Sequence, residues 1–564
     1  MIIDGLNPAF ILIVGGLLVP LLYGTLRKAF MLALPLLGIM QLWGLPYGEM
    51  GLIQIFDFQL VTLRLDQLSF IFTLIFFIAA FLGVLYALHV KDTIQHVAAL
   101  VYSGAAIGAA LAGDLLTLFV YWELTAIASV FLIWARRTQH AFRVGMRYLI
   151  IQIGSGVILL AGVVLHVSAT HSLAFNHIGL EAPGGWLIFI AFGIKCAFPL
   201  LHNWLQDAYP EATVTGTVIL SAFTTKLAVY ALARGFAGTE LLIYIGATMT
   251  AFPIFYAVIE NDLRRVLAYS LNNQLGFMVV GIGIGTELAL NGTAAHAFCH
   301  ILYKALLFMS MGAVLLRAGT VKGSELGGLY KSMPWTTGFC IIGAASISAF
   351  PLFSGFVSKS LILTAVAVEH HWFVWLVLLF ASAGVFHHSG IKIPYFAFFA
   401  HDSGIRCQEA PRNMLIAMGL TAFLCLFIGM VPSALYALLP YEVDYAPYTT
   451  AHVITQLQLL MFSALAFTIL MRTGLYPPEL RSVNIDSDWF YRKLLPAGIQ
   501  RIIAIGSYYQ PRLSARRQRR IAAFIDELYR HHGPEGRFAR TWPTGSMVLW
   551  VAILLASCLL FYYQ

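Results

Sequence analysis

Apolar runs of about twenty residues recur along almost the whole chain, and an α-helix needs a run of that length to cross a lipid bilayer. Only 11% of the 564 residues are charged, whereas an average soluble domain has about 25%. The sequence therefore predicts an all-α polytopic membrane protein and excludes a soluble enzyme with a separate cofactor domain. The first run has no basic segment before it and no clear cleavage site, so we expect it to remain as a helix.

The lengths of these runs predict about sixteen transmembrane helices. Residues 97–135 are the least clearly divided stretch, where Gly113 and Asp114 mark a turn between two helices. The predicted spans are 8–25, 29–45, 66–89, 97–112, 114–135, 146–167, 185–203, 212–234, 240–260, 264–284, 294–317, 337–365, 372–398, 414–439, 453–472 and 545–563.

Basic loops alternate along the chain with loops that are poor in Lys and Arg, such as those around Glu49, Glu181, Glu287 and Glu442. Because cytoplasmic loops carry an excess of Lys and Arg, we expect the N-terminus outside and the basic loops in the cytoplasm, with the chain in a bacterial inner membrane. The net charge of +8 then belongs to these loops and does not indicate nucleic-acid binding. The basic loops contain Arg27, Lys28, Arg136, Arg137, Arg143, Arg147, Arg264, Arg265, Lys322, Lys331, Arg406 and Arg412.

The stretch 191–230 places two lysines, Lys195 and Lys226, inside apolar runs. A charge at the bilayer centre costs about 3 kcal/mol on insertion scales, so it is expected to face a wet or protein-lined interior on an ion pathway. Pro199 follows Lys195 by one turn and removes a backbone hydrogen bond there. A broken helix beside a buried charge is typical of transporters.

Other ionisable residues also fall inside predicted helices. Their combination suits a proton relay, because histidine titrates near neutral pH and a desolvated lysine gives up its proton more readily. The helix breakers Pro351 and Gly355 precede one of the lysines. The set comprises Glu123, His296, His300, Lys304, Lys359, His387, His388 and Lys392.

Simpler interpretations stay open for some of these residues. A single interior histidine often makes only a packing hydrogen bond, and Lys392 and His388 can snorkel to an interface. His296 and His300 are spaced for a metal ion, but no cysteine or acidic residue is nearby, so we expect no metal. The six cysteines form no CxxC motif and are expected to be small core residues. No phosphate loop, haem ligand set or flavin motif is present, so we expect no cofactor.

Two segments are weakly similar: TTKLAVYA around Lys226 and GIKIPYFA around Lys392. Each follows another lysine in a Pro-interrupted helix, and paired interrupted segments indicate inverted repeats. We therefore divide the chain as follows. Helices 1–3 occupy 1–95, two five-helix repeats occupy 96–235 and 236–400, two further helices occupy 401–472, a basic cytoplasmic segment occupies 473–544, and the final helix occupies 545–564.

Several motifs, in this order, resemble those of the proton-translocating antiporter-like family. That family includes the large membrane subunits of respiratory complex I, of membrane-bound hydrogenases and of Mrp-type sodium/proton antiporters. The resemblance implies a helix bundle with two inverted five-helix repeats, discontinuous seventh and twelfth helices, and a polar axis at mid-membrane. The motifs are LDQLS at 65–69, YWELTAIAS at 121–129, GIKCAFPLLHNWLQDA at 193–208, NDLRRVLAYS at 261–270, HAFCHILYKALLF at 296–308, GGLYKSMP at 327–334 and PLFSGFVSKS at 351–360.

In the first repeat, the resemblance implies that Glu123 is the fifth-helix glutamate that pairs with the seventh-helix lysine, Lys195. Lys226 looks like the eighth-helix bridging lysine. The chain departs from the family at WLQDAYPEAT, where members usually have WLPDA and then AP. The turn after the seventh helix is therefore expected to differ.

In the second repeat, His300 and Lys304, with His296, look like the eleventh-helix connecting group. Lys359 looks like the twelfth-helix residue linked to proton exit. After LAYS the family often has a serine-rich run that ends in His or Gln, whereas this chain has LNNQLGF. The amides at 272–274 thus replace ionisable chemistry on the tenth helix, which argues against a proton site there.

The basic segment 473–544 contains Ile521, Phe524, Ile525 and Leu528 at helical spacing. We expect an amphipathic helix at the membrane surface or against a partner subunit, and a solvated linker is the alternative. DSDWFYRK and WPTGSMVLW are most similar to D-type subunits of Mrp antiporters. By that similarity, the segment is expected to lack the very long lateral helix of the distal complex I subunit.

These inferences predict a proton-conducting subunit of a multi-subunit Na⁺ (cation)/H⁺ antiporter. Its expected partners are other integral membrane subunits, protons, Na⁺ and the lipid bilayer, without nucleic acid. One alternative is a proton-pumping subunit of a redox complex, either an NADH:quinone oxidoreductase or a membrane hydrogenase. Another is the membrane subunit of an energy-coupled inorganic-carbon uptake system. No covalent chemistry is expected of the chain itself.

Overall fold

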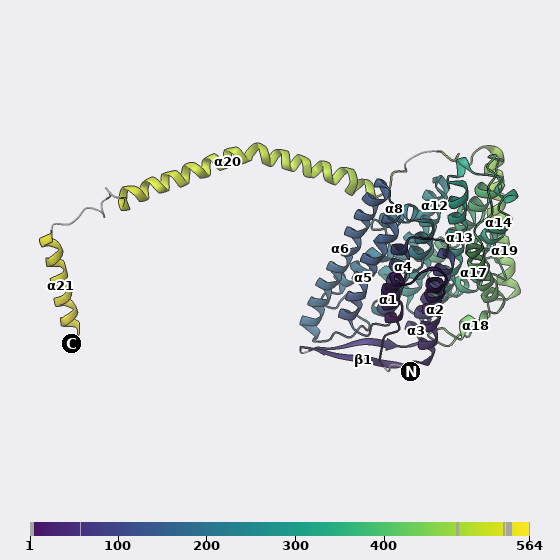
Figure 1. The fold of residues 1–564 in the computed structure, drawn as a ribbon, viewed down its shortest axis with the longest axis horizontal. Helices are drawn as coiled ribbons and strands as arrows, with labels where there is room; N and C mark the ends of the chain where they lie inside the picture. Colours follow the sequence, from purple (N-terminus) through teal and green to yellow (C-terminus); the bar gives the residue numbers. More distant parts are fainter. Residues whose placement is uncertain (1–4, 57, 481–483, 534–535, 537–543, 563–564) are drawn as a thin grey trace. The chain divides into compact units, whose positions relative to one another are not determined.

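The computed structural model describes residues 5–56, 58–480, 484–533, 536 and 544–562. The chain divides into two units, Met1–Asn484 and Ile485–Gln564, which are described separately. The first unit is a bundle of packed helices with a β-hairpin at one end (Figure 1).

Helices dominate the first unit because its apolar runs are long and are separated by short polar turns. Its elements are α1 (Ala9–Leu18), η1 (Val19–Leu21), α2 (Gly24–Gly44), β1 (Gly48–Ile55), β2 (Phe58–Leu65), α3 (Gln67–Ala87), α4 (Thr93–Ala110), α5 (Leu115–Trp134), α6 (Gln139–Thr170), α7 (Gly185–Cys196), α8 (Asn203–Glu211), α9 (Val214–Ala222), α10 (Thr224–Gly235), α11 (Leu241–Ile259), α12 (Leu263–Ile284), α13 (Glu287–Ala318), η2 (Gly323–Glu325), η3 (Leu329–Lys331), α14 (Pro334–Ile347), α15 (Ser354–Val368), α16 (Trp372–Val385), η4 (Phe386–Lys392), η5 (Tyr395–Phe399), α17 (Arg412–Met430), α18 (Pro432–Tyr436) and α19 (Thr450–Thr473).

Twelve helices in the described part of the chain are long and apolar enough to cross a membrane. The chain is therefore a multi-pass membrane protein that is built mainly of α-helices. The predicted spans 8–25, 185–203, 264–284 and 337–365 fall outside these twelve, because α1, α7 and α14–α15 are short or interrupted and α12 contains three adjacent amides, at 272–274. The number sixteen stays a prediction.

The hairpin of β1 and β2 is an addition to the all-helical expectation. The strands pair antiparallel, with Gly48 opposite Leu65. Residues 58–65, FQLVTLRL, contain aromatic and β-branched residues that favour strands. The Val61 amide donates to Asp114 Oδ2 at 2.9 Å, and Gly113 donates to the Val61 carbonyl. These long-range bonds to the turn between α4 and α5 fix β2, and local sequence reasoning did not reveal them.

Both helices that were predicted to be discontinuous break at the same tetrapeptide. Residues 197–200 and 349–352 each read Ala-Phe-Pro-Leu, after the ends of α7 and α14. In both, the Ala and the Leu have positive φ, +62° and +69° in the first and +57° and +74° in the second. Positive φ is uncommon for residues other than Gly. The repeated pattern relates the two halves of the bundle and puts Pro199 and Pro351 in equivalent breaks.

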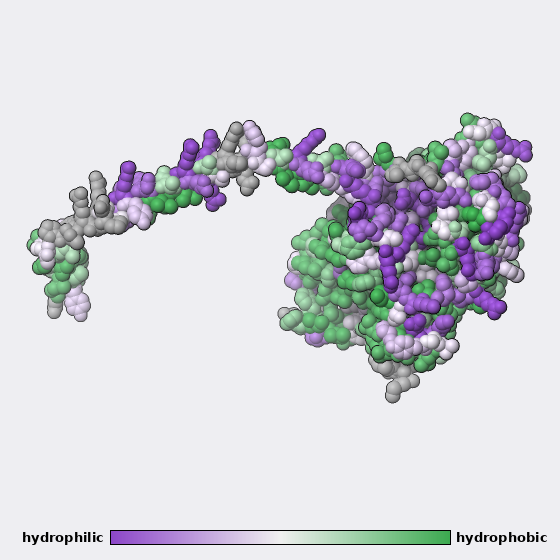
Figure 2. Space-filling model, turned by 45° about the horizontal axis from the view of Figure 1, so that its top comes forward, coloured by the Kyte–Doolittle hydropathy of each residue, from purple (hydrophilic) through white to green (hydrophobic). Residues whose placement is uncertain are grey.

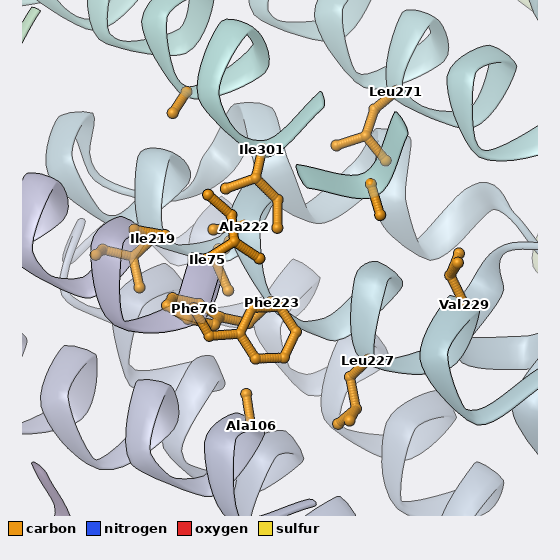
Figure 3. Close-up of a cluster of buried hydrophobic side chains, with 14 of the residues drawn as sticks. Ile75, Phe76, Ala106, Ile219, Ala222, Phe223, Leu227, Val229, Leu271 and Ile301 are labelled. Carbon is orange, nitrogen blue, oxygen red and sulfur yellow. The ribbon is translucent and has the colours of Figure 1, made fainter. Parts of the chain in front are cut away.

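A third break lies between α9 and α10, at Phe223. Its ring packs 5.3 Å from those of Phe76 and Tyr102, between centroids. The apolar core gathers around this break (Figure 3), so the polar groups that the break exposes lie in a dry environment. The labelled core residues are Ile75, Phe76, Ala106, Ile219, Ala222, Phe223, Leu227, Val229, Leu271 and Ile301.

Hydrogen bonds and ion pairs connect the loops that were predicted to be basic, so these loops lie at one end of the bundle. Hydrophilic residues gather along one edge of this unit, next to a largely hydrophobic wall (Figure 2). The connecting contacts are Arg27 to Thr93, Arg137 to Asp92, Arg136 to Glu211, Arg264 to the Pro210 carbonyl, Asn261 to Ser324, and Lys331 to Asp402.

The second unit contains η6 (Phe490–Leu494), α20 (Leu495–His532) and α21 (Thr544–Tyr562). The 38-residue α20 is about 57 Å long at 1.5 Å per residue. Residues 495–532 therefore form one continuous helix. The choice between a surface helix and a solvated linker, and the absence of the very long lateral helix of the distal complex I subunit, stay predictions. Apolar side chains at 521, 524, 525 and 528 share one face, and α20 shows a green side and a purple side in Figure 2. A helix with one apolar face and one polar face is stabilised when the apolar face packs against another apolar surface.

Candidate functional site

The predicted proton-pathway residues lie in the interior of the bundle, on five helices: α5, α7, α10, α13 and α15. Glu123 on α5 is the exception in that it is only partly buried. Lysines that are fully withdrawn from solvent need compensating contacts, so the partners of each ammonium show how it is held. The buried side chains are Lys195, Lys226, His296, His300, Lys304 and Lys359.

Lys195 lies in the last turn of α7 and contacts α5 directly. Its Nζ donates to the Trp122 carbonyl at 2.6 Å and to Thr125 Oγ1 at 2.8 Å, and it lies 4.4 Å from the centroid of the Trp122 ring. An ammonium over an indole gains a cation–π interaction. The Lys195 ammonium thus contacts Trp122, the residue that precedes Glu123 in the chain.

Glu123 makes no direct ion pair with Lys195. Among the described residues, its Oε1 has no hydrogen-bond partner, although this atom is buried. Gly156 of α6 leaves room for the carboxylate, since a Cβ at 156 would overlap Oε1 and Cδ of Glu123. The direct pairing that the resemblance implies is therefore not seen: Lys195 bonds to Trp122 and Thr125, and Glu123 is the residue between these two positions that follows Trp122.

Lys226 lies in the first turn of α10 and spans the third helix break. Its Nζ donates to the Ser221 carbonyl at 2.6 Å and to Thr225 Oγ1 at 3.3 Å. Ser221 is in the last turn of α9, whose final carbonyls have no partner within the helix. The lysine therefore stabilises the break that exposes them.

Lys359 on α15 holds the other broken helix in the same way. Its Nζ donates to the Ile347 carbonyl, the last residue of α14, at 2.7 Å, and it lies 5.2 Å from the centroid of the Phe277 ring. The C-terminal end of a helix carries a partial negative charge. Lys226 and Lys359 are thus held by helix ends, without a carboxylate in the described structure.

His296 of α13 joins a hydrogen-bonded chain across three helices. His296 Nδ1 lies 3.0 Å from Ser358 Oγ on α15, and its Nε2 lies 3.3 Å from Tyr303 Oη. Tyr303 donates to Gln274 Oε1 at 3.1 Å, and Gln274 donates to Asn273 Oδ1 at 2.6 Å. The amides of α12 thus extend the network as neutral groups, so α12 takes part although it has no ionisable residue at these positions.

His300 and Lys304 differ from these residues because they are not fixed by hydrogen bonds. Both ring nitrogens of His300, Nζ of Lys304 and both amide atoms of Asn272 are buried without a partner in the described part of the chain. Leaving a buried polar group unbonded costs about 1–3 kcal/mol. Because buried polar groups in native folds are nearly always bonded, these atoms are candidates for a functional role.

Lys392 is also fully buried, which excludes the snorkelling interpretation for this residue. Its Nζ donates to the carbonyls of Ala257, Val258 and Glu260 at 3.2, 2.6 and 2.7 Å, where α11 ends. It also forms an ion pair of 2.9 Å with Glu479, and the two side chains are 0% and 5% exposed. Burial raises the pKa of Glu479, and the Lys392 ammonium opposes this effect.

His388 connects the region of Lys392 with α12. Its Nδ1 lies 2.9 Å from Ser389 Oγ, which donates to Ser270 Oγ at 2.7 Å. The charges of Lys304, Lys359 and Lys392 all act on this ring. His387 packs instead against the rings of Tyr476 and Phe467, so the two adjacent histidines have different surroundings.

Sequence reasoning missed Glu479, Tyr303 and Gly156. Glu479 follows two prolines in a polar segment, and only the fold brings it to Lys392. Tyr303 lies seven residues after His296, which is the helical spacing of one face and was a usable signal. Among the described residues, no group of three or more His, Cys, Asp or Glu is close enough together to hold a metal ion.

Residues 112–386 match the family described as NADH:quinone oxidoreductase/Mrp antiporter, TM. The chain is 28% identical over 437 residues to hydrogenase-4 component B of Escherichia coli (67% of this chain and 63% of that protein). It is 32% identical over 292 residues to the D subunit of the Na(+)/H(+) antiporter of Alkalihalophilus pseudofirmus (48% of this chain and 59% of that protein). These alignments therefore span less than two thirds of either relative.

Solved structures with the same fold come from three membrane complexes. The membrane-bound sulfane sulfur reductase, an archaeal respiratory complex, matches with a TM-score of 0.71 and 22% identity over 98% of this chain and 99% of that one. The Mrp complex of Dietzia sp. matches with 0.68 and 20%, over 79% and 98%. Complex I of Thermus thermophilus matches with 0.65 and 21%, over 77% and 99%.

Proposed function

We propose a function from the premise that this chain belongs to the antiporter-like family of proton-translocating membrane subunits. The chain conducts protons through the membrane as one subunit of a multi-subunit cation/proton antiporter. Na⁺ is the first candidate for the exchanged cation, because the D subunit of a Na(+)/H(+) antiporter is among the relatives.

One observation carries this proposal: four buried lysines from four different helices have no carboxylate within ion-pair distance in the described structure. An ion pair favours the charged ammonium more strongly than carbonyl and hydroxyl partners do, so a lysine without a carboxylate partner loses its proton more readily. In a membrane, buried ionisable residues of this kind mark a proton relay. The four lysines are Lys195, Lys226, Lys304 and Lys359.

In the proposed pathway, a proton moves from the Glu123 and Lys195 end to Lys226, then to His300 and Lys304, and then to Lys359. His300 and Lys304 serve as the mobile centre because hydrogen bonds do not fix them. His296 and Ser358 couple this centre to α15. The direction of net movement depends on the partners that drive it.

The partners we propose are other integral membrane subunits, in a bacterial inner membrane, with the basic loops in the cytoplasm. Membership of a complex is supported by the three structural matches, all to subunits of membrane assemblies. The second candidate is a proton-pumping subunit of a redox complex. It is favoured by the similarity to hydrogenase-4 component B and by the 98% coverage in the match to an archaeal respiratory complex.

Everted vesicles that contain the chain with its native partners test the two candidates. A pH gradient is imposed and followed with a quenched fluorescent amine, and Na⁺, K⁺ or choline is then added. We expect Na⁺ or K⁺, and not choline, to dissipate the gradient. Acidification that needs a redox donor and ignores all three cations would contradict the antiporter and support the redox candidate.

A further inference from the structure

The ammonium of Lys392 has the most complete oxygen cage of the bundle's buried lysines. Three main-chain carbonyls at the end of α11, those of Ala257, Val258 and Glu260, lie 2.6–3.2 Å from Nζ, and the Glu479 carboxylate lies at 2.9 Å. We call these four groups the Lys392 cage. In contrast, Lys226 and Lys359 each contact a single carbonyl and no carboxylate in the described structure.

This donor set matches what alkali cations bind. Such ions are held by carbonyl and carboxylate oxygens that replace their hydration shell. In transporters, half-helix C-terminal ends supply the carbonyls. An ammonium group is close in size to K⁺, so N–O distances of 2.6–3.2 Å describe a cage for an ion of about that radius.

We propose that the Lys392 cage is the binding site of the exchanged monovalent cation, which competes for it with the ammonium of Lys392. This inference rests on the proposed antiport function and adds the site where exchange occurs. A site that accepts either the ammonium or a cation, and never both, makes cation entry depend on proton release.

The exchange step balances in charge and atoms. A cation M⁺ enters the cage, the Lys392 N–H bond breaks, and the proton passes to the unbonded Nε2 of His388, which feels the charge of Lys392. The cage keeps a single positive charge, and one proton enters the relay for each cation bound. Besides His388, the charged or titratable groups around Lys392 are Glu479, Glu260 and His387.

The local helix geometry allows such a rearrangement. Lys392 ends the π-helical turn η4, and a second π-helical turn, η5, follows. The π-helix is rare and frequently marks functional sites.

Equilibrium binding of radioactive rubidium and sodium ions to the purified complex tests the inference. Lys392→Met removes the competing ammonium and leaves the oxygens, so we expect its affinity to exceed that of the wild type by about tenfold or more at neutral pH. Adding Glu479→Gln to this variant should abolish the gain. Lys359→Met removes a lysine that has no cage and should produce no gain.

Proton release gives a second measurement that does not depend on the stability of Lys392→Met. Addition of the cation to weakly buffered wild-type complex should release protons, and Glu479→Gln, which is nearly isosteric, should reduce that release. The proposed cation site would be overturned if Lys392→Met bound the cation with the affinity of the wild type, or if the variant with both Lys392→Met and Glu479→Gln bound it as tightly as Lys392→Met alone. Equilibrium binding needs no transport, so absent binding with intact proton movement refutes the cage alone, whereas intact binding without proton movement refutes the proposed function alone.

Discussion

Replacing Gly156 by alanine tests whether the position of the Glu123 carboxylate controls proton movement. A Cβ at 156 would lie closer than 3.0 Å to Oε1 and Cδ of Glu123 and 3.2 Å from Cγ. Real Cβ atoms essentially never make the shorter contacts, so the carboxylate has to move. Gly156→Ala thus displaces Glu123 without removing any ionisable group.

The size of the effect follows from the cost of that displacement. An added methyl in a packed site costs about 1–3 kcal/mol. If this penalty falls on the transport-competent position of the carboxylate, the population of that position drops by roughly 5- to 150-fold. We expect the initial rate of cation-driven proton movement in everted vesicles to fall by a factor in this range, while the amount of assembled complex stays close to that of the wild type.

The chain offers a matched control two residues away. Gly154 lies on the same helix, and a Cβ there meets nothing within 4 Å. Gly154→Ala makes the same chemical change, and in a helix it replaces a poor helix former with a good one. Equal transport rates in the two variants, with Gly156→Ala fully assembled, would refute the claim that the Glu123 carboxylate must occupy its observed position.

Two further predictions concern other charged residues. Lys359→Ala should abolish all proton movement in vesicles, since the proposed relay passes through Lys359, whereas Lys392→Ala should abolish only the part that depends on the added cation and leave proton movement driven by a pH gradient alone; complete loss of both kinds of movement in Lys392→Ala would place Lys392 on the relay itself. Asp66 should stabilise the fold above its unfolded pKa of about 3.9. Burial acts to raise its pKa, but the ion pair with Arg234 outweighs this and the pKa is lowered, so this stabilisation is lost as the pH falls towards the folded value. Thermal unfolding followed by tryptophan fluorescence should show this loss in the wild type and not in Asp66→Asn, and identical pH profiles would show that the pair contributes nothing.

The sequence predicted the charged interior well because a bilayer makes each buried charge conspicuous. Lys195 and Lys226 interrupt long apolar runs, and only a protein-lined interior tolerates them. Pro199 and Pro351 likewise predicted two helix breaks, since proline removes a backbone donor. The break at Phe223 carries no such signal, because it is stabilised by the Lys226 contact with the Ser221 carbonyl.

The features that the sequence did not predict depend on contacts between distant segments. Glu479 meets Lys392 across 87 residues of chain, and Asp114 fixes β2 through the Val61 amide. The length of α20 was not predicted, because its many charged residues obscure the helical spacing of apolar residues, which is clear only at 521, 524, 525 and 528.

The central claim is that protons pass through the Glu123 and Lys195 end of the buried line. The most direct measurement is the rate of cation-driven proton movement in vesicles that contain Glu123→Ala or Lys195→Ala, with Lys91→Ala, an exposed lysine, as the control. We predict that both buried variants assemble and move no protons, while Lys91→Ala matches the wild type. Full activity in Glu123→Ala and Lys195→Ala would contradict the relay.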